Sequence, residues 1–235
     1  MERGLVLDIP AGVGGESVRL ARMGFRVFSV DLYPPAADVS AKRWVRADCN
    51  AALPFRTGAF DAVLSREGIE HFENQAGFVR ECARVLRPGG RIVITTPNVM
   101  HLTARLSAML TGQRTMRRGL VNEVETLRAR ACGRFYHGHV FLIDYFRLRY
   151  LMRLAGFGAI QIRTDRFSPS SLALAPVTPL MYAASRLSVA AFARKARQRR
   201  RAIASPELTG EMLGHVFSPA LLFGKRMIVT AVRES

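Results

Sequence analysis

The sequence contains little cysteine and has no long apolar run. Its three cysteines, Cys49, Cys82 and Cys132, are scattered and form no Cys-x-x-Cys pair. This pattern indicates neither a disulfide framework nor a zinc site, and it suits a reducing compartment. The apolar stretch at residues 4–12 is too short and too rich in glycine and proline for a secretory signal. No uninterrupted segment is long enough to span a membrane. We therefore predict a cytoplasmic protein.

Acidic residues and lysine are also scarce. The 235 residues include 35 basic and 18 acidic ones, so the net charge is +17, yet only Lys42, Lys195 and Lys225 are lysines. An arginine excess in a chain rich in alanine, leucine and glycine is typical of a GC-rich genome. The charge alone is therefore weak evidence for a nucleic-acid partner, although it suits RNA, lipid headgroups or phosphorylated substrates.

What is present is enough apolar material for one sizeable core, because 49% of the residues are hydrophobic. We predict one domain over residues 1–235. Apolar runs alternate with helical patterns, which is typical of a parallel α/β sheet. Strands are predicted within residues 4–9, 26–34, 43–50, 60–68, 91–98, 158–167 and 225–234. Helices are predicted after the first glycine loop, within 74–90, and within 144–157 with Asp144 as N-cap.

Two segments depart from this alternation. Residues 99–137 are polar, basic and helical in pattern, and we predict a lid or insertion there. Residues 168–222 form a second, apolar and then basic, helical insertion between the last two strands.

The loop after the first strand is rich in glycine. Gly12, Gly14 and Gly15 lead directly into a helix, and such a loop lets backbone N–H groups approach a ligand closely. Asp31 ends the second strand, where a carboxylate accepts hydrogen bonds from a ribose diol. The alternative is that these glycines serve only a tight turn.

The order of motifs resembles that of class I S-adenosylmethionine-dependent methyltransferases. The resemblance lies in "LVLDIPAGVGG", in "RADCN", in "LPFRTGAFD" and in "ARVLRPGGRIVITTPN", and it covers residues 4–98 and, less closely, 139–166. It implies a Rossmann-like α/β fold: a seven-stranded, mostly parallel sheet with an antiparallel last strand, and helices on both faces.

The resemblance also implies cofactor contacts for S-adenosylmethionine. The methionine part would lie near Asp8, the backbone of Gly12 and Gly14, and Ser65; the ribose near Asp31; and the adenine edge near Asp48 and Cys49. The sequence departs from the family at Pro10, which replaces the usual first glycine and removes one N–H donor. The first strand also begins unusually early, so the substrate must be covered by other segments or the recorded start is short.

The stretch "SREGIEHF", residues 65–72, contains Glu67, Glu70 and His71, which would share one face of a helix. It resembles a motif of ubiquinone-pathway O-methyltransferases and of small-RNA 2′-O-methyltransferases. In the metal-using members, two glutamates and two histidines hold a divalent cation that activates a substrate hydroxyl. The resemblance implies Glu67, Glu70, His71 and His139 as ligands of Mg²⁺ or Mn²⁺, with His137 competing for the last place. The alternatives are a metal-free base, His71 with Glu70, and a purely structural role.

Residues 172–201 are apolar at first and strongly basic at their end. Pro176, Pro179 and Arg186 argue against a spanning helix. Residues 180–201 fit an amphipathic helix in a membrane interface, with Arg194, Lys195 and the later arginines facing anionic lipid at the inner face of the membrane. The alternatives are a lid helix, a dimer contact or, less favoured without aromatic residues for base stacking, an RNA contact.

We therefore predict an S-adenosylmethionine-dependent methyltransferase that acts on a hydroxyl of a glycan, a glycolipid or a quinone-type small molecule, including lipid-linked ones. One alternative is an RNA ribose 2′-O-methyltransferase. The other is a catalytically silent scaffold that retains the cofactor-binding fold.

Overall fold

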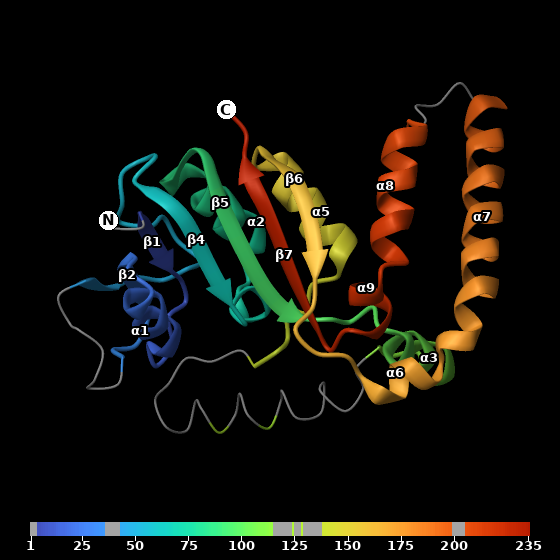
Figure 1. Cartoon of the computed structure of the whole chain (residues 1–235), viewed down its shortest axis with the longest axis horizontal. Coiled ribbons are helices and arrows are strands. Elements are labelled where there is room, and N and C mark those ends of the chain that lie inside the picture. The colour runs from blue at the N-terminus through green and yellow to red at the C-terminus, as the bar shows by residue number, and fades with distance from the viewer. Residues whose placement is uncertain (1–3, 36–42, 115–123, 125–127, 129–137, 199–204) are drawn as a thin grey trace.

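A seven-stranded sheet forms the centre of the computed structural model, which describes residues 4–35, 43–114, 124, 128, 138–198 and 205–235 (Figure 1). The strand order is β3-β2-β1-β4-β5-β7-β6. The strands are β1 (Leu5–Asp8), β2 (Arg26–Asp31), β3 (Trp44–Arg46), β4 (Phe60–Arg66), β5 (Leu86–Pro97), β6 (Phe157–Arg163) and β7 (Arg226–Arg233).

The first five strands pair in parallel, and β7 runs antiparallel to both of its neighbours, β5 and β6. The predicted sheet and its antiparallel last strand are confirmed. Parallel strands need helical crossovers, which cover both faces and explain why the strands read as continuous apolar runs. In β5, for example, Ile92 and Ile94 are fully buried.

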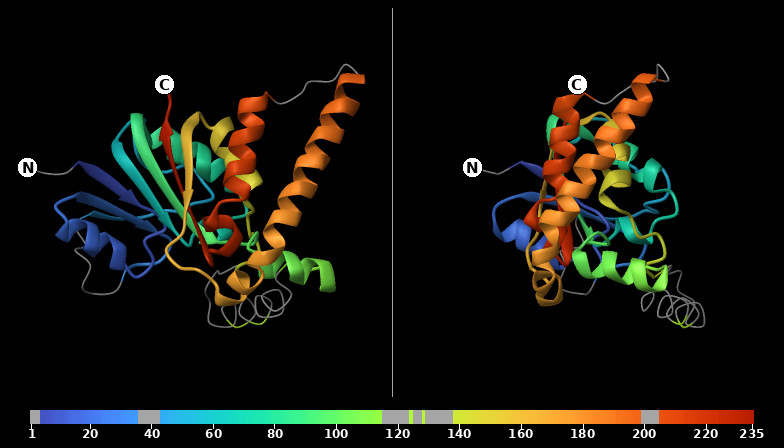
Figure 2. Two further views of the ribbon diagram at one scale, coloured as in Figure 1. Left: turned by 45° about the vertical axis from the view of Figure 1, so that its right-hand side comes forward. Right: turned by 90° about the vertical axis from the view of Figure 1, so that its right-hand side faces the viewer.

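Helices cover both faces of this sheet, as the edge-on view in Figure 2 shows. Helix α1 (Gly15–Arg22) lies on one face, and α2 (Gln75–Val85) and α5 (Tyr145–Leu154) lie on the other. The predicted N-cap is confirmed, because the Asp144 side chain accepts a hydrogen bond from the backbone N–H of Arg147. Asn74 caps α2 in the same way, through the N–H of Gly77.

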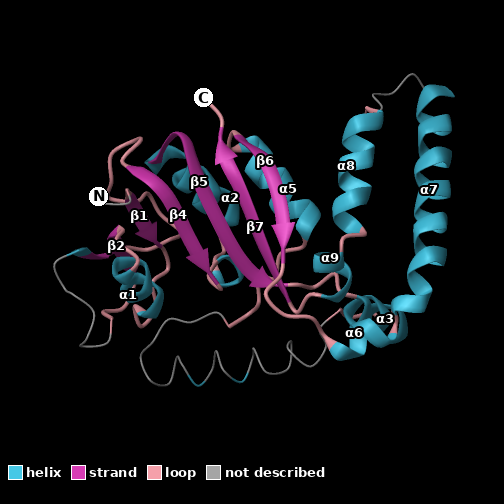
Figure 3. Cartoon of the chain, viewed as in Figure 1, coloured by secondary structure: helices cyan, strands magenta, loops and turns pink. Residues whose placement is uncertain are grey.

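The described part of the segment between β6 and β7 is mostly helical. It contains α6 (Pro169–Ala173), the 3₁₀ turn η3 (Ala175–Val177), α7 (Thr178–Gln198), α8 (Pro206–Val216) and α9 (Pro219–Phe223). Figure 3 shows α7 and α8 standing beside the sheet rather than on a face of it. Of the predicted 99–137 insertion, residues 99–114, 124 and 128 are described, and they include α3 (Leu102–Thr111).

Two polar contacts hold this helical segment to the domain. The buried Arg149 of α5 donates two hydrogen bonds to the Glu211 carboxylate of α8, at 3.0 and 2.8 Å. The buried Asn98 amide, just after β5, donates to the backbone carbonyls of Ala220, Leu221 and Gly224. In the described part of the chain, no helix is both long and apolar enough to cross a membrane.

Candidate active site

A cavity of about 540 Å³ opens at the carboxyl ends of β1 and β2 and extends to the end of β4. Ligands bind at this edge in parallel α/β sheets, and the volume suits a nucleoside-sized ligand. Three of its carboxylates come from consecutive parts of the chain: Asp8 from β1, Asp31 from β2 and Asp48 from the loop after β3. The structure therefore brings together the acidic residues that the sequence motifs singled out.

Asp8 is the most deeply placed of these carboxylates and is only 1% exposed. Its Oδ2 accepts a hydrogen bond from the Ser17 hydroxyl, which in turn accepts one from Ser29. Burial raises the pKa of Asp8 from 3.8 to about 6, although the hydrogen bond from Ser17 opposes the shift. Among the residues that the structure describes, an ionised Asp8 has no cationic partner of comparable burial, and a cationic ligand group would supply one.

Asp31 holds the glycine loop in place. Its two carboxylate oxygens accept hydrogen bonds from the backbone N–H groups of Gly12, at 2.8 Å, and Tyr33, at 3.0 Å. Gly12 lines the cavity with a φ of +54°, a conformation that favours glycine. Gly14, with a φ of +85°, precedes α1 and is not among the lining residues. The Gly12 N–H thus donates its hydrogen bond to Asp31 of the protein, an interaction that the sequence did not indicate.

Asp48 and Cys49 line the cavity on its other side. The Asp48 Oδ1 accepts hydrogen bonds from the backbone and side-chain amides of Asn50, at 2.8 and 3.1 Å. Burial raises the pKa of the Cys49 thiol well above its usual range, so this thiol is neutral.

Ser65 lies apart from the predicted cofactor contacts. Its side chain is fully buried and is not among the residues that line the cavity. The next residue of β4, Arg66, lines the cavity instead and forms an ion pair with Glu16. Successive side chains of a strand point to opposite faces. Ser65, which the motif singled out, therefore points away from the cavity, and the neighbouring Arg66 points toward it.

Pro10 packs against Gly68, a pairing that the sequence did not reveal. A Cβ atom added to Gly68 would lie 2.2 Å from the Cδ and 2.5 Å from the Cγ of Pro10. The proline in the glycine loop therefore requires a glycine after β4, and the two loops that border the cavity interlock at this point.

We expect Gly68→Ala to lower the free energy of unfolding by about 1–3 kcal/mol, because the new methyl group overlaps a rigid ring. Urea unfolding measures this. In a Pro10→Gly background the same substitution should cost at least about 1 kcal/mol less. Gly210→Ala is the matched control, because its Cβ would meet no atom within 4 Å and it lies in α8. Equal losses in both backgrounds would contradict the interlock.

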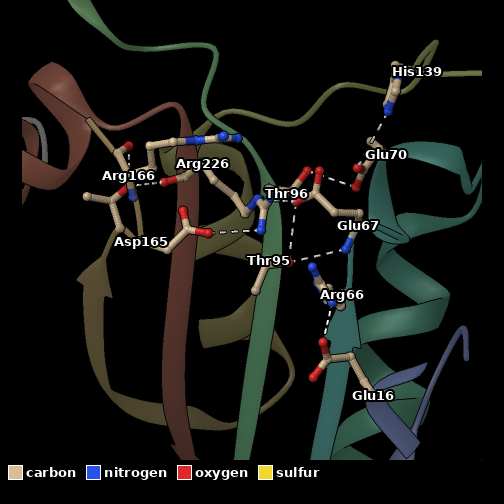
Figure 4. A network of polar contacts seen from close by, with 11 residues as sticks. Glu16, Arg66, Glu67, Glu70, Thr95, Thr96, His139, Asp165, Arg166 and Arg226 are labelled. Carbon is tan, nitrogen blue, oxygen red and sulfur yellow. Dashed lines mark hydrogen bonds and ion pairs between the residues drawn. The ribbon is translucent and has the colours of Figure 1, made fainter. Parts of the chain in front are cut away.

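The stretch "SREGIEHF" is not the single helix on which its predicted face was based. Strand β4 ends at Arg66, Glu67 has a φ of +48°, and Ile69–His71 form the short 3₁₀ helix η2. Glu67 and Glu70 therefore point to different partners. Oε1 of Glu67 lies 3.3 Å from Nε of Arg226 and accepts a hydrogen bond from the Thr95 hydroxyl (Figure 4).

Glu70, His71 and His139 form a compact group without Glu67. One potential ligand atom from each of the three lies within 4.8 Å of the others, and the group that the structure describes does not include Glu67. The His71 and His139 rings lie 4.9 Å apart, and Nε2 of His139 lies 4.0 Å from Oε1 of Glu70. Of the four expected ligands, this group contains Glu70, His71 and His139. The competing residue His137 lies outside the described part of the chain.

Backbone contacts hold His139 beside η2 although the two are far apart in sequence. The N–H of Phe141 donates to the Glu70 carbonyl oxygen at 3.1 Å. The buried Gln75 side chain donates to the carbonyl oxygens of Ile69 and Phe141. Thr96, at the end of β5, donates to Oε2 of Glu70 at 2.9 Å. These bonds position the group independently of any bound ligand.

The orientation of His71 is chemically informative. Its Nδ1 lies 2.5 Å from the Gly138 carbonyl oxygen, which can only accept a hydrogen bond. Nδ1 therefore carries the proton, and in the neutral ring the lone pair is on Nε2. His71 also lines the cavity, so its ring lies beside the space that a substrate would occupy.

Comparison with known proteins supports what this geometry suggests. A family model described as a methyltransferase domain matches residues 7–94. The demethylmenaquinone methyltransferase of Tropheryma whipplei is 36% identical over 95 residues, 38% of this chain and 40% of that protein. The ubiquinone biosynthesis O-methyltransferase of Xanthomonas oryzae is 32% identical over 102 residues, 40% of this chain and 43% of that protein. Residues 7–94 therefore match a methyltransferase domain, and the fold of the chain is similar to that of solved S-adenosylmethionine-dependent methyltransferases.

Solved methyltransferase structures match more of the chain at lower identity. Phosphoethanolamine N-methyltransferase 2 of Haemonchus contortus, solved with S-adenosylmethionine, has a TM-score of 0.54 at 20% identity and covers 100% of this chain and 50% of that one. A methyltransferase from Archaeoglobus fulgidus has a TM-score of 0.56 at 15% identity, covering 97% and 86%. These likenesses show the fold alone.

The match to the family model ends before the site described above is complete. The chain spans less than half the length of the curated relatives named above. The matched residues 7–94 include Asp8, Asp31, Glu70 and His71 but not His139, and they end before the helical segment between β6 and β7.

Proposed function

We propose that this chain transfers the methyl group of S-adenosylmethionine to a hydroxyl of a quinone-type ring that carries two adjacent hydroxyls. The group of Glu70, His71 and His139 at the edge of the cavity is the observation that carries this proposal. Relatives named for ubiquinone biosynthesis and for tocopherol O-methylation support the choice of acceptor. Glycan and glycolipid hydroxyls are the next acceptors to test.

The cavity residues fit the cofactor by their chemistry. The buried Asp8 carboxylate, whose pKa is raised to about 6, suits the ammonium of the methionine part. Each oxygen of Asp31 accepts one backbone hydrogen bond and retains a lone pair for the ribose hydroxyls. Asp48 and Cys49 would lie against the adenine. The bound cofactor supplies an electrophilic methyl group on a positively charged sulfur.

His71 is the group we assign to the acceptor's proton. Nε2 of His71 takes the hydroxyl proton as the acceptor oxygen is methylated, and S-adenosylhomocysteine would be the product that leaves. The Gly138 carbonyl, which accepts from Nδ1, keeps the ring in the tautomer that can accept this proton. The buried Glu70 carboxylate lies beside His139, whose ring lies next to that of His71.

A divalent cation also fits this group, since a carboxylate and two imidazoles are ligands that Mn²⁺ accepts. Glu70, His71 and His139 would hold it. Bound there, it would lower the pKa of an acceptor hydroxyl.

Methyl transfer to dihydroxy acceptors, compared with transfer to the matching monohydroxy compounds, tests the proposal. We expect release of S-adenosylhomocysteine with 3,4-dihydroxybenzoate and its alkyl esters, and much less with the monohydroxy analogues. His71→Ala should lower kcat/KM by about 100-fold or more. Glu81→Gln is the control, because Glu81 pairs with Arg84 and is not among the residues that line the cavity. Equal rates on the mono- and dihydroxy acceptors, or no effect of His71→Ala, would contradict the proposal.

A further inference from the structure

Helix α7 is unusual because almost none of it is buried. Ala196 is the one buried side chain among its 21 residues, all of which the structure describes. Tyr182 packs edge-on against Phe217, which follows α8, with ring centroids 5.1 Å apart. Figures 1 and 2 show α7 as the outermost helix on this side of the molecule.

The outer side of α7 is apolar. Leu180, Ala184, Leu187 and Ala191, here called the outer stripe, follow one another at intervals of four, three and four residues and share one face of the helix. All four are exposed, and the two leucines are 73% and 72% exposed. An ordered apolar stripe of this kind marks an interaction surface rather than scattered surface residues.

The charge on α7 points to the kind of partner. The outer stripe continues into Arg194 and Lys195 on the same face, with Arg197 in the same turn. The sequence has no acidic residue between Asp165 and Glu207. A helix with an exposed apolar stripe and cations without any acidic residue complements an anionic lipid surface.

A second copy of the chain fits this surface less well. It would present another strongly basic molecule to the same cations, since the net charge is +17. Helix α7 is about 30 Å long. Like every other described helix, it is not both long and apolar enough to cross a bilayer. It can lie along one. We propose that α7 docks the protein on an anionic lipid bilayer, with the outer stripe in the headgroup region and Arg194, Lys195 and Arg197 on lipid phosphates.

This docking is independent of methyl transfer, and α7 is joined to the rest of the fold at its N-terminal end and through the contact of Tyr182 with Phe217. The ion pair of Arg149 with Glu211 fixes α8 to α5. Helix α7 begins next to η3 and α6, and α6 contacts α3 through hydrogen bonds between the side chains of Ser171 and Thr103. The N-terminal part of the outer stripe therefore lies on a helix that is anchored to the fold.

Co-sedimentation of the full chain with vesicles tests the proposal. We expect pelleting with vesicles of phosphatidylcholine and phosphatidylglycerol, none with phosphatidylcholine alone, and loss of binding at high salt. Leu180→Gln/Leu187→Gln should weaken binding by about tenfold or more. Arg194→Gln/Lys195→Gln/Arg197→Gln should weaken it by about fivefold for each charge removed, since each contributes about 1 kcal/mol.

Matched controls separate α7 from the general charge of the protein. Tyr150→Gln/Leu154→Gln removes two exposed apolar side chains of α5, and Arg56→Gln/Arg91→Gln/Arg163→Gln removes three exposed charges elsewhere. Both should pellet like the wild type. Absence of wild-type binding, or equal losses in the controls, overturns the proposal. The proposal is also overturned if the α7 variants bind vesicles as tightly as the wild type and sedimentation velocity shows that they have lost a dimer. Helicity and S-adenosylhomocysteine binding confirm folding, and neither requires methyl transfer.

Discussion

Replacing Asp8 with asparagine should make the ligand-free protein more stable while weakening its binding of S-adenosylhomocysteine. Burial raises the pKa of Asp8 to about 6 from its ordinary 3.8. At pH 7.5 the folded chain therefore holds an ionised carboxylate at a cost on the order of 2–3 kcal/mol. Asparagine removes the charge and keeps an oxygen that accepts from Ser17.

The sign of the pH dependence follows from the same shift. Between about pH 4 and pH 6 the unfolded chain loses the Asp8 proton before the folded chain does. The contribution of Asp8 to stability is therefore intact below pH 4, declines as the pH rises through this window, and is lost above pH 6. We expect the stability difference between Asp8→Asn and the wild type, measured by urea unfolding, to grow from near zero at pH 4 to its full value above pH 6.

Asp61→Asn is a control of opposite sign. The pKa of Asp61 is lowered by hydrogen bonds from the Leu5 N–H and the Arg87 guanidinium. Its ionised form favours folding above the ordinary pKa and loses that effect as the pH falls. This substitution should therefore destabilise the protein at pH 7.5 and leave ligand binding unchanged, because Asp61 is not among the residues that line the cavity.

Binding should change in the direction opposite to stability. The ammonium of S-adenosylhomocysteine would pair with the ionised form of Asp8, so wild-type affinity should increase as the pH rises through 6. Asp8→Asn should lower the affinity at pH 7.5 by about 10- to 100-fold, the value of a lost charge-assisted hydrogen bond. Isothermal titration calorimetry measures both. A variant that is less stable and binds as tightly as the wild type would refute this role of Asp8.

Manganese should bind the wild-type protein at one site, and replacing Glu70 and His71 together with alanine should weaken this binding by about 100-fold or more. Two of the three grouped side chains are removed in this variant. The fold around the site should persist, because the backbone bond from Phe141 to the Glu70 carbonyl does not depend on either side chain. Calorimetric titration of Mn²⁺ into the complex with S-adenosylhomocysteine measures the change.

Glu67→Ala is the matched control for the metal experiment. The Glu67 carboxylate is engaged by Arg226 and Thr95, so its removal should leave the Mn²⁺ affinity nearly unchanged. A large loss in this control would restore Glu67 to the ligand set. Absence of Mn²⁺ binding in the wild type would leave His71 as a base that acts without a metal.

The residue pattern predicts much of the architecture correctly. All seven strands and the helices after the glycine loop, before β5 and before β6 occur where the apolar runs and caps indicated, whereas the antiparallel direction of β7 was expected only from the family resemblance. These features depend on local periodicity, on capping and on the burial of parallel strands, which the chain expresses within short stretches. The positions of Asp8, Asp31 and Asp48 follow from the same rule, because carboxyl ends of parallel strands meet at one edge.

The grouping of side chains around "SREGIEHF" was decided by contacts between distant parts of the chain. Insertion of β7 beside β5 brings Arg226 to Glu67 and so removes that carboxylate from the histidines. Return of the chain after the 99–137 insertion brings His139 to Glu70 and Gly138 to His71. Spacing along the sequence indicates which residues share an element. Which partner a charged side chain finds depends on the strand order and on backbone hydrogen bonds that only the folded chain forms.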